Sequence, residues 1–244
     1  MVANEANSST VAFIAPGPKG QSRSNVLYVG ATYTGKSNMC RNVPAVSSRS
    51  LESGNFLDLA NIDMTTSTRM QVNSLVQKSY RIDYVYGFSS EGFSYFLTRQ
   101  RESMKSTAPI ISKLVRVCHD DPSYHSYVEV PIKCMDQNRK DYNLVQSAYL
   151  SKPGVDLAAR LDIQTTDDVL FASFSLSNDK EGKSTANSAF KNALCVYSMK
   201  SVRSMFTENI QKCFTGAGET GLPFIMPSYP CINVVSNLIS ISCF

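Results

Sequence analysis

The chain has 244 residues, of which 43% are hydrophobic and 18% are charged, and its formal net charge is +4. This composition excludes a long disordered tail, and the small, scattered basic excess excludes an obvious nucleic-acid partner. Only two histidines are present, so a histidine-based metal centre is not expected. No apolar run approaches the roughly 18 residues that a membrane-spanning helix needs.

Short segments rich in Val, Ile, Tyr and Phe, bounded by turn-forming residues, predict β-strands along most of the chain. The clearest pattern is a hairpin of 84–88 and 93–97, whose loop 89–92 contains Gly92 at a position suited to positive φ. Many short strands in hairpin order favour an all-β sandwich or propeller, and periodicity alone does not choose between them. The predicted strands are 26–29, 82–88, 93–98, 110–117, 126–132, 142–150, 168–176 and 193–198.

Helix is predicted in few places. A helix is expected near 198–213, because Val202, Phe206, Ile210 and Cys213 recur at helical spacing on one face. A shorter one is expected over 156–161, after Pro153 and Gly154. The polar stretch 178–192 is predicted to be a long exposed loop.

One motif is typical of a nucleotide-binding enzyme. Residues 30–37 (GATYTGKS) fit the P-loop pattern and follow the predicted strand 26–29. In a P-loop the backbone N–H groups cradle phosphates, the lysine (here Lys36) reaches the β- and γ-phosphates, and the serine (here Ser37) binds Mg²⁺. The chain therefore has a candidate site for a P-loop NTPase.

Three observations count against that site. A P-loop opens a helix, but Pro44 and poor helix formers follow Ser37 closely. No apolar strand that ends in an aspartate follows to complete the Mg²⁺ site. P-loop folds also alternate strands with helices, whereas this chain runs from strand to strand. A structural loop is therefore the preferred interpretation.

Other reactive residues form weaker patterns. Cys118, His119, Asp120 and Asp121 adjoin in sequence, but neighbouring side chains at a strand end point in opposite directions, so His119 is interpreted as a turn residue. The acidic pair 167–168 offers too few oxygens for Ca²⁺.

Seven well-separated cysteines without a C-x-x-C pair leave two possibilities open, extracellular disulfides or buried free thiols. The sequon at Asn7 is a candidate glycosylation site.

Six blocks in order resemble the extracellular sema domain of the plexins, the cell-surface receptors for semaphorins. The resemblance extends over about residues 25–232 and is strongest in the hairpin YVYGFSSEGF and in the stretch that follows Val117. The resemblance to the hepatocyte-growth-factor-receptor class is weaker. The blocks are 43–51, 84–100, 114–134, 142–154, 167–174 and 193–199.

The resemblance implies an all-β fold, a partial seven-bladed β-propeller formed by an interior portion of the sema domain. Residues 1–24 are then expected to be a flexible N-terminal flank and 25–244 the incomplete sema domain. The chain itself shows neither a signal peptide nor a transmembrane segment, and it is expected to be part of a longer receptor on the extracellular side of the plasma membrane. No enzymatic activity, cofactor, metal, nucleotide or nucleic-acid partner is expected.

The expected partner is a semaphorin, whose own propeller meets the receptor at a modest polar interface. A dimeric ligand would bring two receptors together, and bivalency would raise their effective concentration. Candidate contact loops are 101–108, 135–141 and 178–192, because exposed loops often carry function. The alternatives are the sema module of a hepatocyte-growth-factor-receptor-like kinase and, less favoured, the P-loop NTPase.

The resemblance also implies how the cysteines pair, which spacing alone could not choose among the 15 pairings open to six cysteines. The implied disulfides are Cys118–Cys243, Cys134–Cys195 and Cys213–Cys231. Cys40 has no family partner and is expected to be a free thiol, or to pair with a cysteine outside this sequence.

Overall fold

Strands dominate the architecture, as the spacing of β-branched and aromatic residues predicts. The computed structural model describes residues 8–17, 24–33, 43–60, 67–176, 192–217, 220–226 and 231. The strands are β1 (Thr10–Pro16), β2 (Asn25–Ala31), β3 (Val46–Arg49), β4 (Arg69–Val72), β5 (Ile82–Ser90), β6 (Phe93–Arg101), β7 (Ile110–Cys118), β8 (Val128–Pro131), β9 (Leu144–Ser151), β10 (Val169–Ser175), β11 (Asn192–Ser198) and β12 (Ile225–Met226). The helices are α1 (Val155–Leu161) and α2 (Met199–Phe214).

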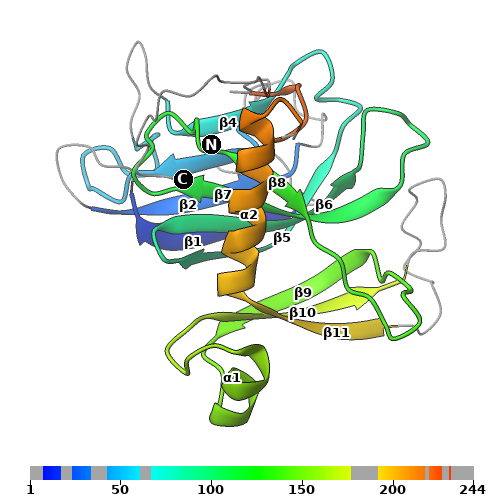
Figure 1. Ribbon diagram of the computed structural model, residues 1–244. Coiled ribbons are helices and arrows are strands. Elements are labelled where there is room, and N and C mark those ends of the chain that lie inside the picture. The colour runs from blue at the N-terminus through cyan, green and yellow to red at the C-terminus, as the bar shows by residue number, and fades with distance from the viewer. Residues whose placement is uncertain are drawn as a thin grey trace.

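These strands form three antiparallel sheets (Figure 1). The N-terminal sheet has the order β1-β2-β3-β4-β12, the central sheet β5-β6-β7-β8, and the C-terminal sheet β11-β10-β9. In the central sheet each strand pairs with its neighbour in sequence, which is the connectivity of a propeller blade. The all-β fold expected from the sequence is confirmed, and the three sheets form part of a β-propeller.

The predicted hairpin is present as β5 and β6, with a tighter turn than the sequence suggested. Ser89 and Ser90 still pair with β6, so only Glu91 and Gly92 form the turn. Their φ angles are 45° and 82°. Two residues at positive φ are the geometry that joins twisted antiparallel strands without splaying them.

The central sheet is the middle layer of the molecule. One of its faces packs against the N-terminal sheet in a core that includes Tyr84, Phe96 and Val115. The opposite face packs against the C-terminal sheet and α2 in a second core that includes Leu97 and Leu114. Because both faces are covered, β6 and β7 are buried almost continuously rather than at alternate positions.

Helix α2 crosses from the C-terminal sheet to the central sheet (Figure 1). The Ser198 side chain caps its N-terminus by accepting a hydrogen bond from Ser201 N at 3.0 Å. Val202, Phe206 and Ile210 are buried in the second core, which confirms the helix and the face predicted near 198–213. Helix α1 confirms the shorter helix expected over 156–161.

The expected flexible flank over 1–24 is wrong for Thr10–Pro16. These residues form β1, which pairs with β2 from Thr10 opposite Ala31 to Pro16 opposite Asn25. Val11, Phe13 and Ala15 alternate toward the core between the N-terminal and central sheets, and that burial holds the strand in place. Where the sema domain begins therefore stays a prediction, with β1 now included in the folded part.

Two of the three disulfides implied by the resemblance are present. Cys134 bonds to Cys195 with a Cα–Cα distance of 5.8 Å, and Cys213 bonds to Cys231 at 4.5 Å. The first joins the segment after β8 to β11, and the second holds the end of α2. Cys118 is also disulfide-bonded. Three further predictions fall outside the described residues: the disulfide partner Cys243, the free thiol Cys40 and the sequon at Asn7.

The third disulfide can be identified by peptide mapping without reduction. We expect a cross-linked peptide pair that contains Cys118 and Cys243, and an alkylated Cys40. Closing this loop of 125 residues should stabilise the fold by about 4–5 kcal/mol on the chain-entropy model. Recovery of Cys118 linked to Cys40 would contradict this pairing.

The buried histidine His119 should make the folded state sensitive to acid. Its side chain lies between the N-terminal and central sheets. Burial lowers the pKa of His119 from 6.5 to about 4. The folded state therefore favours the neutral ring, so stability is full above about pH 6.5 and is lost as the pH falls toward 4. We expect a loss of about 2 kcal/mol over this range in urea titrations.

The His119→Gln variant should lose this part of the pH dependence. Its matched control is His125→Gln, which removes an exposed histidine and should keep the wild-type profile. Identical profiles for the two variants would show that His119 is not the group responsible.

Candidate functional site

The P-loop-like segment begins inside a sheet. Gly30 pairs with Val11 on one side and with Val46 on the other, so it lies within β2 rather than in a turn. The N–H of Ala31 donates to Ala45 O at 3.0 Å, and the N–H of Thr32 donates to Ser9 O at 2.9 Å. Donors that would cradle phosphate in a P-loop are thus used by neighbouring strands.

The second half of the motif, 34–37, lies outside the described residues, and with it the candidate phosphate and Mg²⁺ ligands Lys36 and Ser37. The described half has a packing role instead. A Cβ added at Gly30 would lie 2.7 Å from Cε1 of Tyr84, an approach that atoms cannot make. Glycine stands at this position because the ring of Tyr84 on β5 lies directly against the backbone of β2.

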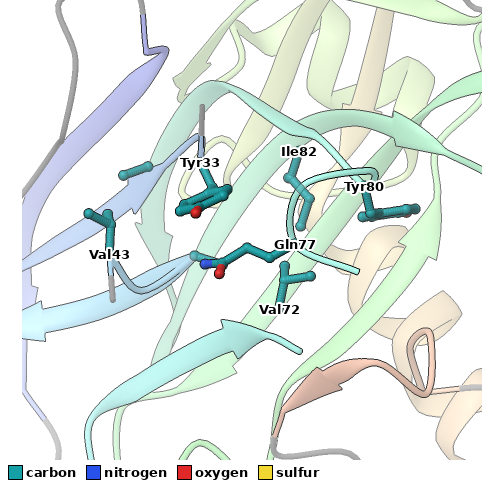
Figure 2. Close-up of a pocket in the computed structure, with 8 residues that line it drawn as sticks. Tyr33, Val43, Val72, Gln77, Tyr80 and Ile82 are labelled. Carbon is teal, nitrogen blue, oxygen red and sulfur yellow. The ribbon is translucent and has the colours of Figure 1, made fainter. Parts of the chain in front are cut away.

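A small pocket lies beside this segment and is shown in Figure 2. Its volume is about 10 Å³, which is room for about one water molecule, whereas small-molecule sites have about 300–1,000 Å³. None of its lining residues is charged. In Figure 2, Gln77 lies between Tyr33 and Val72. The lining residues are Ala31, Tyr33, Val43, Ala45, Val72, Gln77, Tyr80 and Ile82.

Tyr80 lines this pocket but uses its hydroxyl elsewhere. The hydroxyl donates to Gln100 Oε1 at 2.9 Å and lies 2.7 Å from the carbonyl oxygen of Arg101. Burial raises the pKa of Tyr80 well above its usual range, so the ring stays a neutral hydrogen-bond donor. The pocket is therefore an apolar gap behind the β2–β5 contact, with neither the size nor the charge for a nucleotide.

His119 and Ser94 form a pair that resembles a catalytic dyad. Ser94 Oγ lies 3.0 Å from His119 Nε2, and both side chains are buried between the two sheets. An imidazole with a pKa of about 4 is a weak base at neutral pH, and Ser94 is fully enclosed. The geometry suits a structural hydrogen bond rather than attack on a substrate.

The turn after β7 places the other members of the Cys-His-Asp-Asp stretch. Cys118 is disulfide-bonded and cannot act as a thiolate nucleophile. Asp121 organises the turn, because its carboxylate accepts hydrogen bonds from Ser123 N at 3.1 Å and Ser126 N at 2.6 Å. His119 does begin this turn, as the sequence suggested, but its ring is buried rather than exposed. The structure thus divides this sequence cluster among separate roles.

A buried ion pair lies on the face of the central sheet that meets the N-terminal sheet. Lys113 Nζ on β7 lies 2.9 Å from Glu129 Oε2 on β8, and the Tyr127 hydroxyl donates to Glu129 Oε1 at 2.6 Å. Burial, reinforced by the charge of Glu129, raises the pKa of Tyr127 well above its usual range. The carboxylate is therefore held by a cation and by a neutral phenol, an arrangement that fixes the sheet contact.

Two of the candidate contact loops lie together at one end of the central sheet. Loop 101–108 joins β6 to β7, and loop 135–141 follows β8. Their bases meet where Asn143 Nδ2 donates to Ile110 O at 3.0 Å. We call them the paired loops. Most of loop 178–192 lies outside the described residues.

The paired loops are structured and present exposed side chains. Asp136 Oδ1 accepts hydrogen bonds from Asn138 N at 2.8 Å and Lys140 N at 2.9 Å, which closes the second loop. Met104 and Met135 are about half exposed. Several exposed basic residues stand beside them, among them Lys105 and Lys140. This mixed apolar and basic surface is chemically suited to a protein partner.

The comparisons with known proteins agree on one kind of domain. A model described as "Sema domain" matches residues 145–236. Plexin-A3 of Rattus norvegicus is 36% identical over 221 residues, which is 85% of this chain and 11% of the relative. Plexin-A4 of Mus musculus is 40% identical over 159 residues, 62% of this chain and 8% of the relative. This chain thus spans about a tenth of the length of these curated relatives.

A solved structure of the Plexin A4 full extracellular region is similar to this fold. The TM-score is 0.79 at 30% identity, and the match covers 97% of this chain and 26% of that one. In the described part of the chain, neither helix has the length and apolar character needed to cross a bilayer.

Sequence reasoning missed the role of Gly30, and the structure suggests a direct test. Gly30→Ala forces a Cβ against the Tyr84 ring and should destabilise the fold by about 2–4 kcal/mol, as other overpacked or strained core sites do. Gly54→Ala is the matched control, because a Cβ there meets nothing within 4 Å.

Thermal melts of the two variants measure this difference. A large loss for Gly30→Ala together with wild-type behaviour of Gly54→Ala is expected. Equal melting temperatures for the two variants would mean that β2 and Tyr84 are not packed as described.

Proposed function

We propose that this chain, which belongs to the plexin family of sema-domain proteins, is a ligand-binding portion of a semaphorin-receptor ectodomain. The observation that carries the proposal is the fold match to the Plexin A4 extracellular region over 97% of the chain at 30% identity. The sequence matches to plexin relatives at 35–40% identity support it independently.

The role proposed is recognition rather than catalysis. A propeller built from stacked sheets presents its inter-strand loops on rigid supports, and such loops recognise partners well. A dimeric semaphorin would hold two receptor chains at a fixed spacing, and the raised effective concentration would favour their association. Signalling would then follow from the geometry of the pair.

The paired loops are our candidate for part of the ligand-facing surface. The central sheet, buried on both faces, holds the bases of both loops in place. Their exposed methionines and basic side chains complement a partner surface that combines apolar and acidic groups. Because this surface carries only a few basic groups, we expect a moderate binding affinity. The affinity should fall markedly as the salt concentration rises, since exposed charges are screened by salt.

The proposed location is the extracellular side of the plasma membrane. Two disulfides tie segments of the described fold together, and such bonds persist in oxidising compartments. This supports a receptor portion that is exposed outside the cell.

Surface-immobilised chain should bind a dimeric semaphorin ectodomain more tightly than the same ectodomain made monomeric. The double variant Lys105→Glu and Lys140→Glu should weaken binding about 10-fold through lost charge complementarity. The control is Lys200→Glu, the same change on an exposed residue at the start of α2, on a different element from the paired loops.

Binding is measured by interferometry across the plexin-binding semaphorins. Failure of the wild-type chain to bind any of them would overturn the proposed function. Equal weakening by the loop variant and by Lys200→Glu would overturn only the placement of the surface.

A further inference from the structure

A buried arginine lies between two aromatic rings where α2 packs on the central sheet. Arg116 on β7 is 3% exposed. Its guanidinium carbon lies 4.3 Å from the ring centroid of Phe93 on β6 and 4.6 Å from that of Phe206 on α2. The rings stabilise the cation through their faces, but they leave the in-plane N–H groups to find other partners.

No carboxylate in the described part of the chain pairs with Arg116. Arg203, on α2 three residues before Phe206, pairs with Glu91 of the β5–β6 turn at 2.9 Å. The charged and polar groups that act on Arg116 are Arg203 and the hydroxyl of Tyr95, its cross-strand neighbour on β6. The single carboxylate of this cluster, Glu91, thus pairs with Arg203 alone, and Arg116 is left as an uncompensated positive charge.

Several polar atoms of this cluster are enclosed without a hydrogen-bond partner. They are Arg116 Nε, Arg203 Nη1 and the Tyr95 hydroxyl oxygen, which interacts with the Arg116 guanidinium but does not form a hydrogen bond of ordinary geometry. The two guanidinium nitrogens can only donate, and the hydroxyl can turn to donate as well. A buried donor left without an acceptor costs roughly 1–3 kcal/mol, and more when it is charged. Three such atoms, in residues that interact electrostatically with one another, indicate that an acceptor belongs there.

We propose that Arg116, Arg203 and Tyr95 form a binding site for a small inorganic anion of the size of chloride. An anion accepts from all three donors and balances the excess charge, whereas a water molecule would leave the charge uncompensated. The enclosure of Tyr95 and Phe206, both 0% exposed, leaves no room for a side chain from a partner protein. A monatomic ion suits this degree of burial.

The ion would reach the cluster at its more exposed edge. The side chains of Arg203 and Glu91 are 23% and 50% exposed, so their ion pair lies at the surface beside the buried groups. Once bound, the anion would join β6 and β7 to α2 through charge-assisted hydrogen bonds. The site would therefore stabilise the docking of α2 on the central sheet.

Thermal unfolding in chloride tests the site. Chloride replaces gluconate at a constant ionic strength of about 0.15 M, so that general screening does not change. Because a ligand that binds only the folded state stabilises it, we expect the midpoint of the wild-type chain to rise by about 3 °C. Arg116→Met should abolish the rise, and Tyr95→Phe should reduce it.

Arg99→Met is the matched control. Arg99 also lies on β6 and has an enclosed Nε without a partner, but it lies outside the cluster, so its variant should keep the chloride response. If Arg116→Met fails to fold, Tyr95→Phe still distinguishes the site. Crystals grown in bromide should show an anomalous peak beside Arg116.

Two results would overturn the proposal. One is a wild-type midpoint that does not respond to chloride at constant ionic strength. The other is a chloride response that persists in Tyr95→Phe and Arg116→Met at its full size. Neither result bears on semaphorin binding, so the anion site stands or falls separately from the proposed function.

Discussion

The rest of the structure depends on the close contact between the N-terminal and central sheets, which two glycines make possible. Gly30 on β2 admits the ring of Tyr84 from β5, and Gly87 on β5 admits the ring of Phe13 from β1, at a distance where a Cβ would lie 2.6 Å from that ring. Each sheet thus inserts an aromatic side chain into the backbone of the other. This reciprocal contact fixes the distance between the sheets and places β1, which would otherwise be an edge strand without support.

The central sheet carries buried charged side chains on both of its faces. The charge is accommodated in a different way on each face. Toward the N-terminal sheet, Lys113 and Glu129 neutralise each other. Toward α2, Arg116 lies between two aromatic rings and beside the Tyr95 hydroxyl, and the like charge of Arg203 acts against it. Removing one partner of a buried pair typically costs about 3–5 kcal/mol, because it leaves the other charge without compensation. Both arrangements make the packing of neighbouring layers specific, since a shifted register would separate Lys113 from Glu129 and Arg116 from the rings that contact it.

The sequence allowed the hairpin, α2 and the all-β class to be predicted, because each rests on local periodicity or turn chemistry. The sequence analysis did not identify β1, whose strand character depends on the distant core that receives Phe13. They also could not show that Gly30 serves Tyr84, because that contact spans more than 50 residues of sequence. The disulfide pairs came from family resemblance, not from spacing. Neither the sequence nor the fold predicts which residues contact a ligand, because those contacts depend on the shape of the partner.

The disulfide between Cys134 and Cys195 has a mechanical consequence. It spans 61 residues of sequence, and this stretch includes all of β9, α1 and β10. If tension is applied across this stretch, it passes through the covalent link and bypasses everything between the two cysteines. About 200 Å of contour length is then unavailable for extension. The disulfide therefore protects β9, α1 and β10 from forces that would unfold the N-terminal sheet. The molecule thus has one segment that is shielded from tension and another that unfolds under it.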